Sequence, residues 1–414
     1  GLPPLKRNRL LVATAHAACL GLVAAACGDD DDEAAETPAE TEAAAEDAPA
    51  ETEAAEEEAP AETEAAEEEM AEAVCPPNIV VQKDWWPELE HGGTYQLIGT
   101  DGEVDAANFN YSGPIADAYK VGGVETVEIR AGGDAVSFTP VTSLMATDDD
   151  ITFGYVAFSD IVADSVAAPV VAVGKTLDVD PQMVMWDPEQ LDISAPADIA
   201  ASGAEVLHFD GAAYIDYMIG EGLMEEGQSN PSYGGAPDTW VAQGGNFIQQ
   251  GFATNEVYKY ESEIEWKDGA PAPVEFFTVA DLGFDNYPAL MSVRADRLEE
   301  LSPCLEVLVP AMAQAWVDYL ADPTPITDKI TEINVDYNTY WSTSPELNAR
   351  GIEIIETEGI AVNSPDGTYC SMDPDRAQEV YDILAPIYDE RGIDIAEDVA
   401  ATFDNSFCEG APGR

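Results

Sequence analysis

The chain has 414 residues and a formal net charge of −66 at pH 7, with 82 acidic and only 16 basic residues. This charge argues strongly against nucleic acid as a partner, because an acidic surface is repelled by phosphates. It need not mean a cationic ligand, because a high-salt or marine setting favours solvated acidic surfaces equally well. The chain has three histidines, which are too few to favour a multi-histidine metal site or a histidine-dependent catalytic triad.

Residues 1–28 have the pattern of an export signal. Three basic residues near the start are followed by an uncharged run from Leu10 to Ala26, which is marginal against the about 20 residues of a spanning helix. Small side chains then precede Cys27, as a signal peptidase requires. This ending is similar to the lipobox of bacterial lipoproteins. We expect a lipoprotein signal peptide over residues 1–27, with Cys27 lipidated. A plain secretory signal and an uncleaved anchor are the alternatives.

Residues 28–74 have the composition of a linker. An 11-residue unit occurs three times between Thr37 and Glu69, as TPAETEAAAED once and APAETEAAEEE twice. From Asp29 to Ala73 there are 21 acidic residues and no basic one. Such a segment cannot build a core, and its like charges repel. We predict a disordered acidic tether whose reach is on the order of 150 Å at ~3.3 Å per residue.

The chain from Cys75 onward is long enough for two lobes, because single cores stop growing near ~250–300 residues. Short apolar strands alternate with amphipathic segments, which is typical of parallel α/β sheets. We predict strands at Asn78–Asp84, Thr126–Ala131, Ile151–Val156, Pro169–Lys175, Met183–Trp186, Glu205–Phe209, Phe247–Gly251 and Val274–Val279. Helices are predicted at Ala195–Ser202, Ala212–Glu221, Asp238–Gln243 and Asn255–Trp266, then at Asp296–Leu301, Cys304–Leu320, Thr324–Ile333, Pro345–Glu358, Asp373–Arg391 and Ile395–Thr402.

Four cysteines follow the signal, namely Cys75, Cys304, Cys370 and Cys408. An even number in an oxidising compartment predicts two disulfides, with three possible pairings. Of these we expect Cys75–Cys304 and Cys370–Cys408. No Cys-x-x-Cys spacing or histidine pair supports a metal site, and we expect no cofactor.

An unusual loop follows the first predicted strand. It contains Trp85 and Trp86, then Pro87, and soon afterwards the pair Gly92-Gly93. Large aromatic side chains at the end of a strand, in a loop constrained by Pro and Gly, are placed to meet a ligand. The alternative is that both tryptophans simply pack beneath the loop.

The spacing Asp84-Trp85-x-Pro87-x-x-x-His91-x-Gly93-x-Tyr95 resembles a signature of the thiamine-pyrimidine-related binding proteins. Their group includes the nitrate, sulfonate, taurine and riboflavin binding proteins of ABC importers. Glu88 and Glu90 stand where asparagines are common in that signature. Two later parts of the chain also resemble segments of this group. One is Phe153–Asp160 together with Pro169–Gly174, and the other is Gly251–Glu256.

The resemblance implies an α/β, two-lobed type 2 periplasmic-binding fold with hinged lobes and a helical C-terminal part. Lobe 1 would comprise residues 76–170 plus 284–414, and lobe 2 residues 171–283. The resemblance also implies that Trp85 and Tyr95 stack on or flank a planar ligand. His91 would hydrogen-bond that ligand or brace the loop.

Ligands of open α/β sheets lie beyond the C-terminal ends of the strands. Gly211, before a helix, would free backbone N–H groups for a ligand, or simply begin the helix. Tyr214 points either into the cleft or into the core of lobe 2. The full set of candidate ligand-binding residues is Trp85, Trp86, His91, Tyr95, Phe158, Ser159, Gly211, Tyr214, Asn255, Glu256 and Tyr287.

We therefore expect a monomeric solute-binding component of an ABC importer, not an enzyme. It would be exported, lipid-anchored to the outer face of the cytoplasmic membrane, and partnered by a permease and its ATPase. Aromatic faces with Ser, Asn and Glu suit a neutral or cationic heterocycle, such as a pyrimidine- or flavin-like ring. The alternatives are an anion of the nitrate, sulfonate or taurine type, an enzyme similar to a thiamine-pyrimidine synthase, and a surface interaction lipoprotein.

Overall fold

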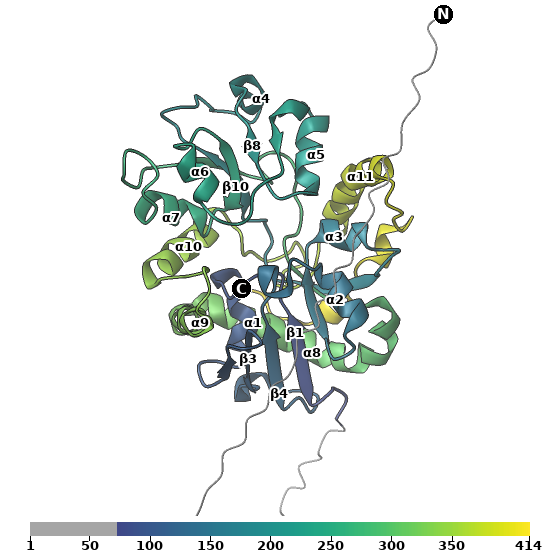
Figure 1. The fold of residues 1–414 in the computed structure, drawn as a ribbon. Helices are drawn as coiled ribbons and strands as arrows, with labels where there is room; N and C mark the ends of the chain where they lie inside the picture. The colour runs from purple at the N-terminus through teal and green to yellow at the C-terminus, as the bar shows by residue number, and fades with distance from the viewer. Residues whose placement is uncertain (1–72) are drawn as a thin grey trace, which may run out of the picture. The chain divides into compact units, whose positions relative to one another are not determined.

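Two β-sheets organise residues 73–414, which are the residues that the computed structural model describes (Figure 1). These residues belong to one compact unit of the chain. The predicted signal peptide, Cys27 and nearly all of the acidic linker lie outside the described residues. No helix among residues 73–414 combines the length and the apolar character needed to cross a membrane.

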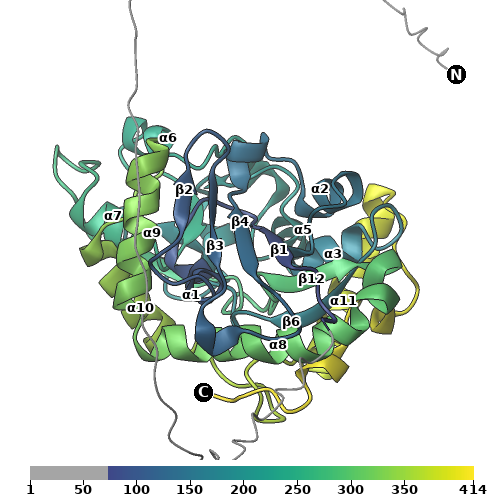
Figure 2. The same cartoon turned by 90° about the horizontal axis from the view of Figure 1, so that it is seen from below.

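The first sheet has seven strands in the order β2-β3-β4-β1-β5-β12-β6, which can be followed in Figure 2. Its central strand β1 pairs in parallel with β4 and β5, whereas β12 pairs antiparallel with β5 and β6. The seven strands are β1 (Asn78–Gln82), β2 (Glu103–Asp105), β3 (Asn110–Pro114), β4 (Thr126–Arg130), β5 (Phe153–Val156), β6 (Val170–Lys175) and β12 (Leu290–Arg294).

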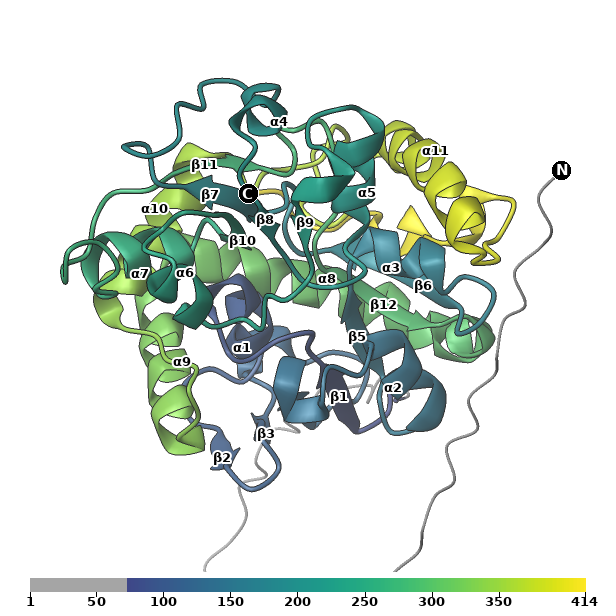
Figure 3. The ribbon, with the colours of Figure 1, turned by 45° about the horizontal axis from the view of Figure 1, so that its top comes forward.

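The second sheet has five strands in the order β11-β7-β10-β8-β9 (Figure 3). Its middle strand β10 is parallel to β8 and antiparallel to β7. The five strands are β7 (Gln182–Trp186), β8 (Val206–Leu207), β9 (Ser229–Asn230), β10 (Ile248–Phe252) and β11 (Glu275–Thr278).

Helices cover both sheets, and the C-terminal helices also reach from one sheet to the other. Helix α10 contacts α7, while α11 contacts both α3 and α5, as Figure 1 shows. The helices are α1 (Gly92–Gln96), α2 (Val141–Thr147), α3 (Phe158–Ala163), α4 (Asp198–Ser202), α5 (Ala213–Gly220), α6 (Asp238–Ala242), α7 (Glu256–Ser262), α8 (Leu298–Ala321), α9 (Thr324–Tyr337), α10 (Pro345–Thr357) and α11 (Pro374–Arg391). We call the seven-stranded sheet with α1–α3, α8 and α9 the first lobe, and the five-stranded sheet with α4–α7 the second lobe.

Both predicted disulfides are present. One joins Cys75, just before β1, to Cys304 on α8, and the other joins Cys370 to Cys408. The first spans 229 residues of sequence. A cross-link over so long a separation removes much conformational freedom from the unfolded chain, and it ties the first strand to the C-terminal half.

The sheets differ from the prediction of parallel strands. Both are mixed, because β12 returns antiparallel into the first sheet and β7 runs antiparallel to β10. Strands β2, β3, β9 and β12 were not predicted. The strand Val170–Lys175 pairs with β12 in the first sheet, so the chain leaves that sheet after Lys175, and the lobe boundary expected at residue 170 falls too early.

The C-terminal part is helical, as predicted, with two local differences. Helix α8 is continuous through Pro303 and Pro310. The sequence had predicted two helices there, separated by a break just before Cys304. The buried face of α8, which includes Leu305, Met312 and Trp316, packs into the core, so burial outweighs the helix-breaking effect of proline. The helix predicted at Ile395–Thr402 is only a short 3-10 turn, Val399–Ala401.

Candidate ligand-binding site

A cavity of about 100 Å³ lies between the two lobes, beyond the end of β1. It is bordered by side chains of the loop that follows β1, by the end of β10 and by the loops around β8 and β9. The lining residues are Asp84, Trp85, Glu88 and Trp341 from the first lobe and the segment after α9, with Phe209, Tyr233, Gly235, Gln250, Gly251, Phe252 and Glu256 from the second lobe.

Trp85 stands where the lobes meet. Its ring centroid lies 5.7 Å from that of Trp341 and 6.1 Å from that of Phe209. The rings of Phe209 and Tyr233 are in turn 5.0 Å apart. A continuous line of aromatic side chains therefore crosses from one lobe to the other, at the position where a ligand bound between them would lie.

Two glycines after β4 determine where Trp85 stands. The backbone N–H groups of Gly132 and Gly133 donate hydrogen bonds to the carbonyl oxygens of Trp85 and Asp84, each at 2.9 Å. A Cβ atom on Gly132 would lie 2.3 Å from the carbonyl oxygen of Lys83, and one on Gly133 would lie 2.8 Å from the Trp85 ring. Only glycine allows the two loops to approach this closely.

Three carboxylates line the cavity and a fourth lies behind it. Burial, with Glu90 and Asp84 nearby, raises the pKa of Glu88 well above its usual value. Burial likewise raises the pKa of Glu90 to about 7, although Thr254 donates a hydrogen bond to that carboxylate. Burial also raises the pKa of Glu256. The cavity is thus lined by acidic residues, and burial favours the protonated form of Glu88 and Glu256 in its lining and of Glu90 behind it.

His91 and Lys83 support this acidic wall from the protein interior. Burial lowers the pKa of His91 to about 4, so the neutral ring donates from Nε2 to Asp84 Oδ1 at 3.0 Å. Burial alone would raise the pKa of Asp84, but this hydrogen bond, the charge of Lys83 nearby and a backbone hydrogen bond together hold that pKa below its usual value. The Lys83 ammonium lies 3.0 Å from the centre of the Tyr155 ring and 3.2 Å from Thr94 Oγ1. The hydrogen bond between His91 and Asp84 thus joins two residues of the loop that follows β1.

The structure brings only part of the predicted set to the cavity. Trp85 and Glu256 line it directly, and Asn255 is the N-cap residue of α7 beside it. Trp86 and Tyr95 are buried in the core of the first lobe, where Trp86 contacts Phe109 and Tyr337. The pattern of the loop could not separate Trp85 from Trp86, because both follow the same strand.

The remaining predicted residues lie away from the cavity. Phe158 is fully buried, and the backbone N–H of Ser159 donates to Asn286. Tyr214 points into the second lobe, where its hydroxyl donates to Gln250 Oε1 at 3.2 Å. The hydroxyl of Tyr287 accepts a hydrogen bond from the backbone N–H of Asp373 at 2.8 Å.

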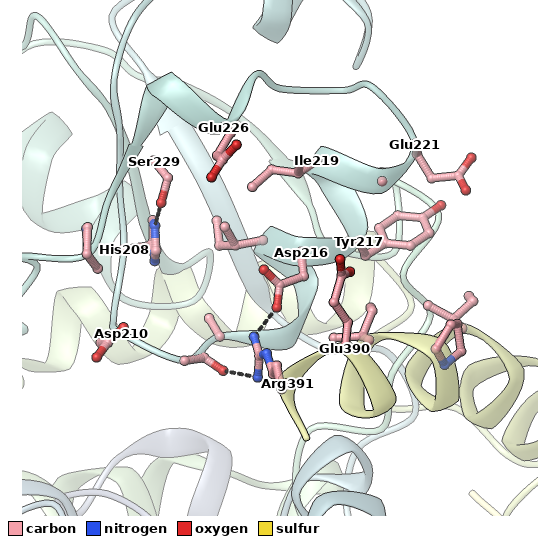
Figure 4. A pocket seen from close by; sticks show the side chains of 18 of the residues that line it. His208, Asp210, Asp216, Tyr217, Ile219, Glu221, Glu226, Ser229, Glu390 and Arg391 are labelled. Carbon is pink, nitrogen blue, oxygen red and sulfur yellow. Dashed lines mark hydrogen bonds and ion pairs between the residues drawn. The ribbon is translucent and has the colours of Figure 1, made fainter. Parts of the chain in front are cut away.

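Gly211 borders a separate open groove between α5 and α11, shown in Figure 4. Arg391 of α11 bridges the two sides, because its guanidinium donates to the Gly211 carbonyl oxygen and to the Asp216 carboxylate. His208 hydrogen-bonds Ser229 on the far wall of the same groove. This groove therefore contains an ion pair between the second lobe and α11.

A further hollow of about 400 Å³ lies on the first-lobe side of Trp85. Asp84 and Trp85 belong to both hollows. Asp160, at the start of α3, also lines the second one, and burial together with Asp164 raises the pKa of Asp160 to about 6. The space beside Trp85 is therefore acidic on both sides of the indole.

Several lining residues were not among the predicted ones. Phe209 is the last residue of a predicted strand. An aromatic residue at the end of a strand was the feature of the sequence that could have indicated a role in ligand binding. Trp341 lies in a turn between two helices, far along the chain from the loop it contacts. Nothing in its local pattern distinguishes it from a core residue. Asp84 and Glu88 lie within the motif, but neither is among the residues predicted to bind the ligand.

The two glycines of the motif have a structural role. A Cβ atom on Gly92 would lie 2.1 Å from the Tyr319 ring, and one on Gly93 would lie 2.2 Å from the Trp316 ring. Both rings are buried on α8. The glycines therefore let α1 pack directly on α8, which positions the loop that carries Trp85 and Glu88.

We expect Gly93→Ala to lower the free energy of unfolding by roughly 1–3 kcal/mol, because the added methyl group must displace the buried Trp316 ring. Urea denaturation measures the change. Gly227→Ala is the matched control, since a Cβ atom there meets nothing within 4 Å. Equal stability of the two variants would show that α1 and α8 are not packed as described.

Known proteins resemble this chain in structure and not in sequence. Neither a family model nor a curated protein sequence matches it. The ligand-binding component of an ABC-type import system from Staphylococcus aureus, solved with zinc bound, has a TM-score of 0.51 at 9% identity, over 81% of this chain and 99% of that one. A protein from Bordetella bronchiseptica RB50 has a TM-score of 0.53 at 14% identity, over 81% and 97%.

A third solved structure is the periplasmic aliphatic sulphonate binding protein of Escherichia coli. Its TM-score is 0.50 at 10% identity, over 79% of this chain and 92% of that one. Among residues 73–414 there is no group of three or more His, Cys, Asp or Glu side chains that could hold a metal ion. The described part of this chain therefore has the two-lobed α/β fold of the periplasmic binding proteins, with a helical C-terminal part, as its sequence predicted.

Proposed function

We propose that this protein is the extracytoplasmic ligand-binding component of an ABC-type importer. In this proposal a small planar ligand is captured between the lobes. The observation that carries it is the line of aromatic side chains across the cavity, with Trp85 and Trp341 on one side and Phe209 and Tyr233 on the other. A ligand held by rings from both lobes stabilises their closed arrangement. A permease could then recognise that arrangement.

The size of the cavity favours a small ring. About 100 Å³ is less than the ~300–1,000 Å³ of sites for drug-sized ligands. A single pyrimidine-like ring suits this space better than a flavin-like ring system, which would need the lobes to move apart. Planar rings also stack well on indole and phenol faces.

An anion of the nitrate or sulfonate type is the second candidate. The name of the Escherichia coli neighbour states that it binds aliphatic sulphonates. A cation also lies beside the cavity, because the ammonium of Lys259 is 4.4 Å from the centre of the ring of Trp341, a lining residue. Against this candidate, no residue that lines the cavity in the described part of the chain is Lys or Arg.

We also propose that a lipid on Cys27 holds the protein at the outer face of the cytoplasmic membrane, next to a permease and its ATPase. The small residues before Cys27 support this. The protein would act as a monomer and would bind its ligand without converting it. Metabolic labelling with palmitate tests the lipid, and a chain that takes up no label contradicts it.

A thermal-shift screen followed by native mass spectrometry tests the function. The purified chain is exposed to pyrimidines, flavins, amines, sulfonates and nitrate. A ligand at 100 times its Kd stabilises the folded protein by about 2.7 kcal/mol, and we expect such stabilisation from a small planar compound. Stabilisation by sulfonates or nitrate alone would favour the second candidate. Chemical conversion of a hit would indicate an enzyme, and the absence of any hit would contradict ligand capture.

A further inference from the structure

We propose that the ligand of this cavity carries a positive charge, as an organic ammonium or a protonated heterocycle, and that Glu88 and Glu256 are its counter-charges. This inference rests on the proposed function and narrows its substrate class. Aromatic faces attract cations through their quadrupole, and the attraction grows when water is excluded. The cavity combines such faces with carboxylates that have no cation beside them in its lining.

Glu88 is the strongest single indication. Its side chain is 9% exposed and lines the cavity, yet no described residue donates a hydrogen bond to its carboxylate. Among the described Lys, Arg and His side chains, only His91 has a nitrogen within 4.0 Å of this carboxyl group, Nε2 at 3.6 Å, and that atom already donates to Asp84 at 3.0 Å. Burial raises the pKa of Glu88, and a nearby positive charge would favour its ionised form. A cation in the cavity would supply the missing partner.

Glu256 offers a second carboxylate from the opposite lobe. Its Oε2 accepts a hydrogen bond from the backbone N–H of Phe252 at 2.7 Å, which fixes the direction of the side chain at the start of α7. A Cβ atom on Gly251 would lie 2.9 Å from the Glu256 side chain, so this side chain packs tightly against β10. A cation between Glu88 and Glu256 would therefore connect the first lobe to the second.

The protein places its own ammonium groups on aromatic faces close to this cavity. Lys259 lies over Trp341 and Lys83 lies over Tyr155. Burial lowers the pKa of both lysines. Neither lysine lines the cavity. The same combination of ring and ammonium is thus used twice beside the cavity. These lysines act on the cavity carboxylates only from outside its lining, where the charge of Lys259 lowers the pKa of Glu256 and the charge of Lys83 lowers that of Glu88.

Binding of a cation should release protons. The pKa values of Glu88, Glu90 and Glu256 are raised in the free protein, and a nearby positive charge favours the ionised carboxylate. The apparent affinity for a cation should therefore increase as the pH rises through about 7, the pKa of Glu90, whereas an anion would show proton uptake and the opposite trend. Among the charged or titratable groups, Asp84, Glu88, Tyr233 and Glu256 line the cavity. Lys83, Glu90, His91 and Lys259 lie behind or beside this lining.

Three probes on one aromatic frame test the charge of the ligand. Benzylamine is a cation at neutral pH, benzyl alcohol is uncharged and benzenesulfonate is an anion. Their affinities for the purified chain are measured by calorimetry in two buffers of different ionisation enthalpy, which also reports the number of protons released or taken up. We expect benzylamine to bind at least tenfold more tightly than benzyl alcohol, with net proton release.

Two matched variants locate the effect. Glu88→Gln keeps the size of the side chain and should reduce the preference for benzylamine over benzyl alcohol at least fivefold, while the affinity for benzyl alcohol changes by less than about twofold. Lys259→Met removes the cation beside Trp341 and should leave benzylamine binding unchanged or tighter. Far-ultraviolet circular dichroism and the melting temperature check that both variants fold.

The outcomes distinguish the inference that the ligand is cationic from the proposal that the protein binds a ligand between its lobes. Equal or tighter binding of benzyl alcohol or benzenesulfonate, or loss of binding in Lys259→Met, overturns the inference and leaves ligand capture intact. If none of the three probes binds, the same two variants are tested with the tightest compound of the broader screen. An uncharged or anionic compound there overturns the inference too. If that screen also has no hit, the proposed function itself is contradicted.

Discussion

Trp85→Ala is expected to lower the affinity for the ligand at least tenfold, a loss of about 1.4 kcal/mol or more of binding free energy. The indole contacts Trp341 and Phe209 at the junction of the lobes, so its removal takes away the aromatic surface that both lobes share. The melting temperature should change little, because the side chain is only partly buried. Calorimetric titration with the tightest hit of the screen measures the affinity.

Trp85→Phe is the control for this variant. It keeps a flat apolar side chain and should retain affinity within about threefold to fivefold, since much of the stacking surface remains. A large fall in the melting temperature of Trp85→Ala with unchanged affinity would mean that this indole belongs to the core. The loop would then have no part in binding.

The neighbouring substitution should have the opposite effect. Trp86→Ala is expected to lower the free energy of unfolding by about 3–5 kcal/mol, as deletion of a large buried aromatic side chain does. Trp86 is 1% exposed, packs edge-on against Phe109 at 5.0 Å, and its Nε1 donates to Asp134. Urea denaturation followed by circular dichroism measures the change.

Ligand affinity distinguishes the two tryptophans further. The folded fraction of Trp86→Ala should bind the ligand within about threefold of the unsubstituted protein, because Trp86 does not line the cavity. A tenfold loss of affinity at full folding would show that Trp86 contacts the ligand. The division of roles between the two residues would then be wrong.

Local patterns predicted the fold well where an element is apolar and short. β1, β4 and β7 appear near their predicted ranges, because β1 and β7 are runs of mostly buried residues and β4 alternates buried with more exposed residues. β2 and β3 lie in the acidic stretch of residues 102–124, where buried positions such as Tyr111 are isolated. β12 is stabilised by partners on both sides that come from distant parts of the chain, so no local pattern could indicate its place.

The site was predicted in part for a similar reason. The loop after β1 is continuous in sequence, and its aromatic and acidic residues could be read directly. Trp341 and Tyr233 reach the cavity only through the packing of the lobes. Trp85 and Trp86 are adjacent in sequence, yet one side chain lines the cavity and the other is buried. The close approach of Gly132 and Gly133 to the backbone of the loop fixes this arrangement.

A crystal structure of the protein with the tightest hit of the screen tests ligand capture most directly. We predict electron density for the compound between the lobes, with its ring against Trp85 and its polar or charged group near Glu88 and Glu256. Density instead in the groove between α5 and α11, or on a surface of one lobe alone, with the cavity beside Trp85 unchanged, would contradict the account.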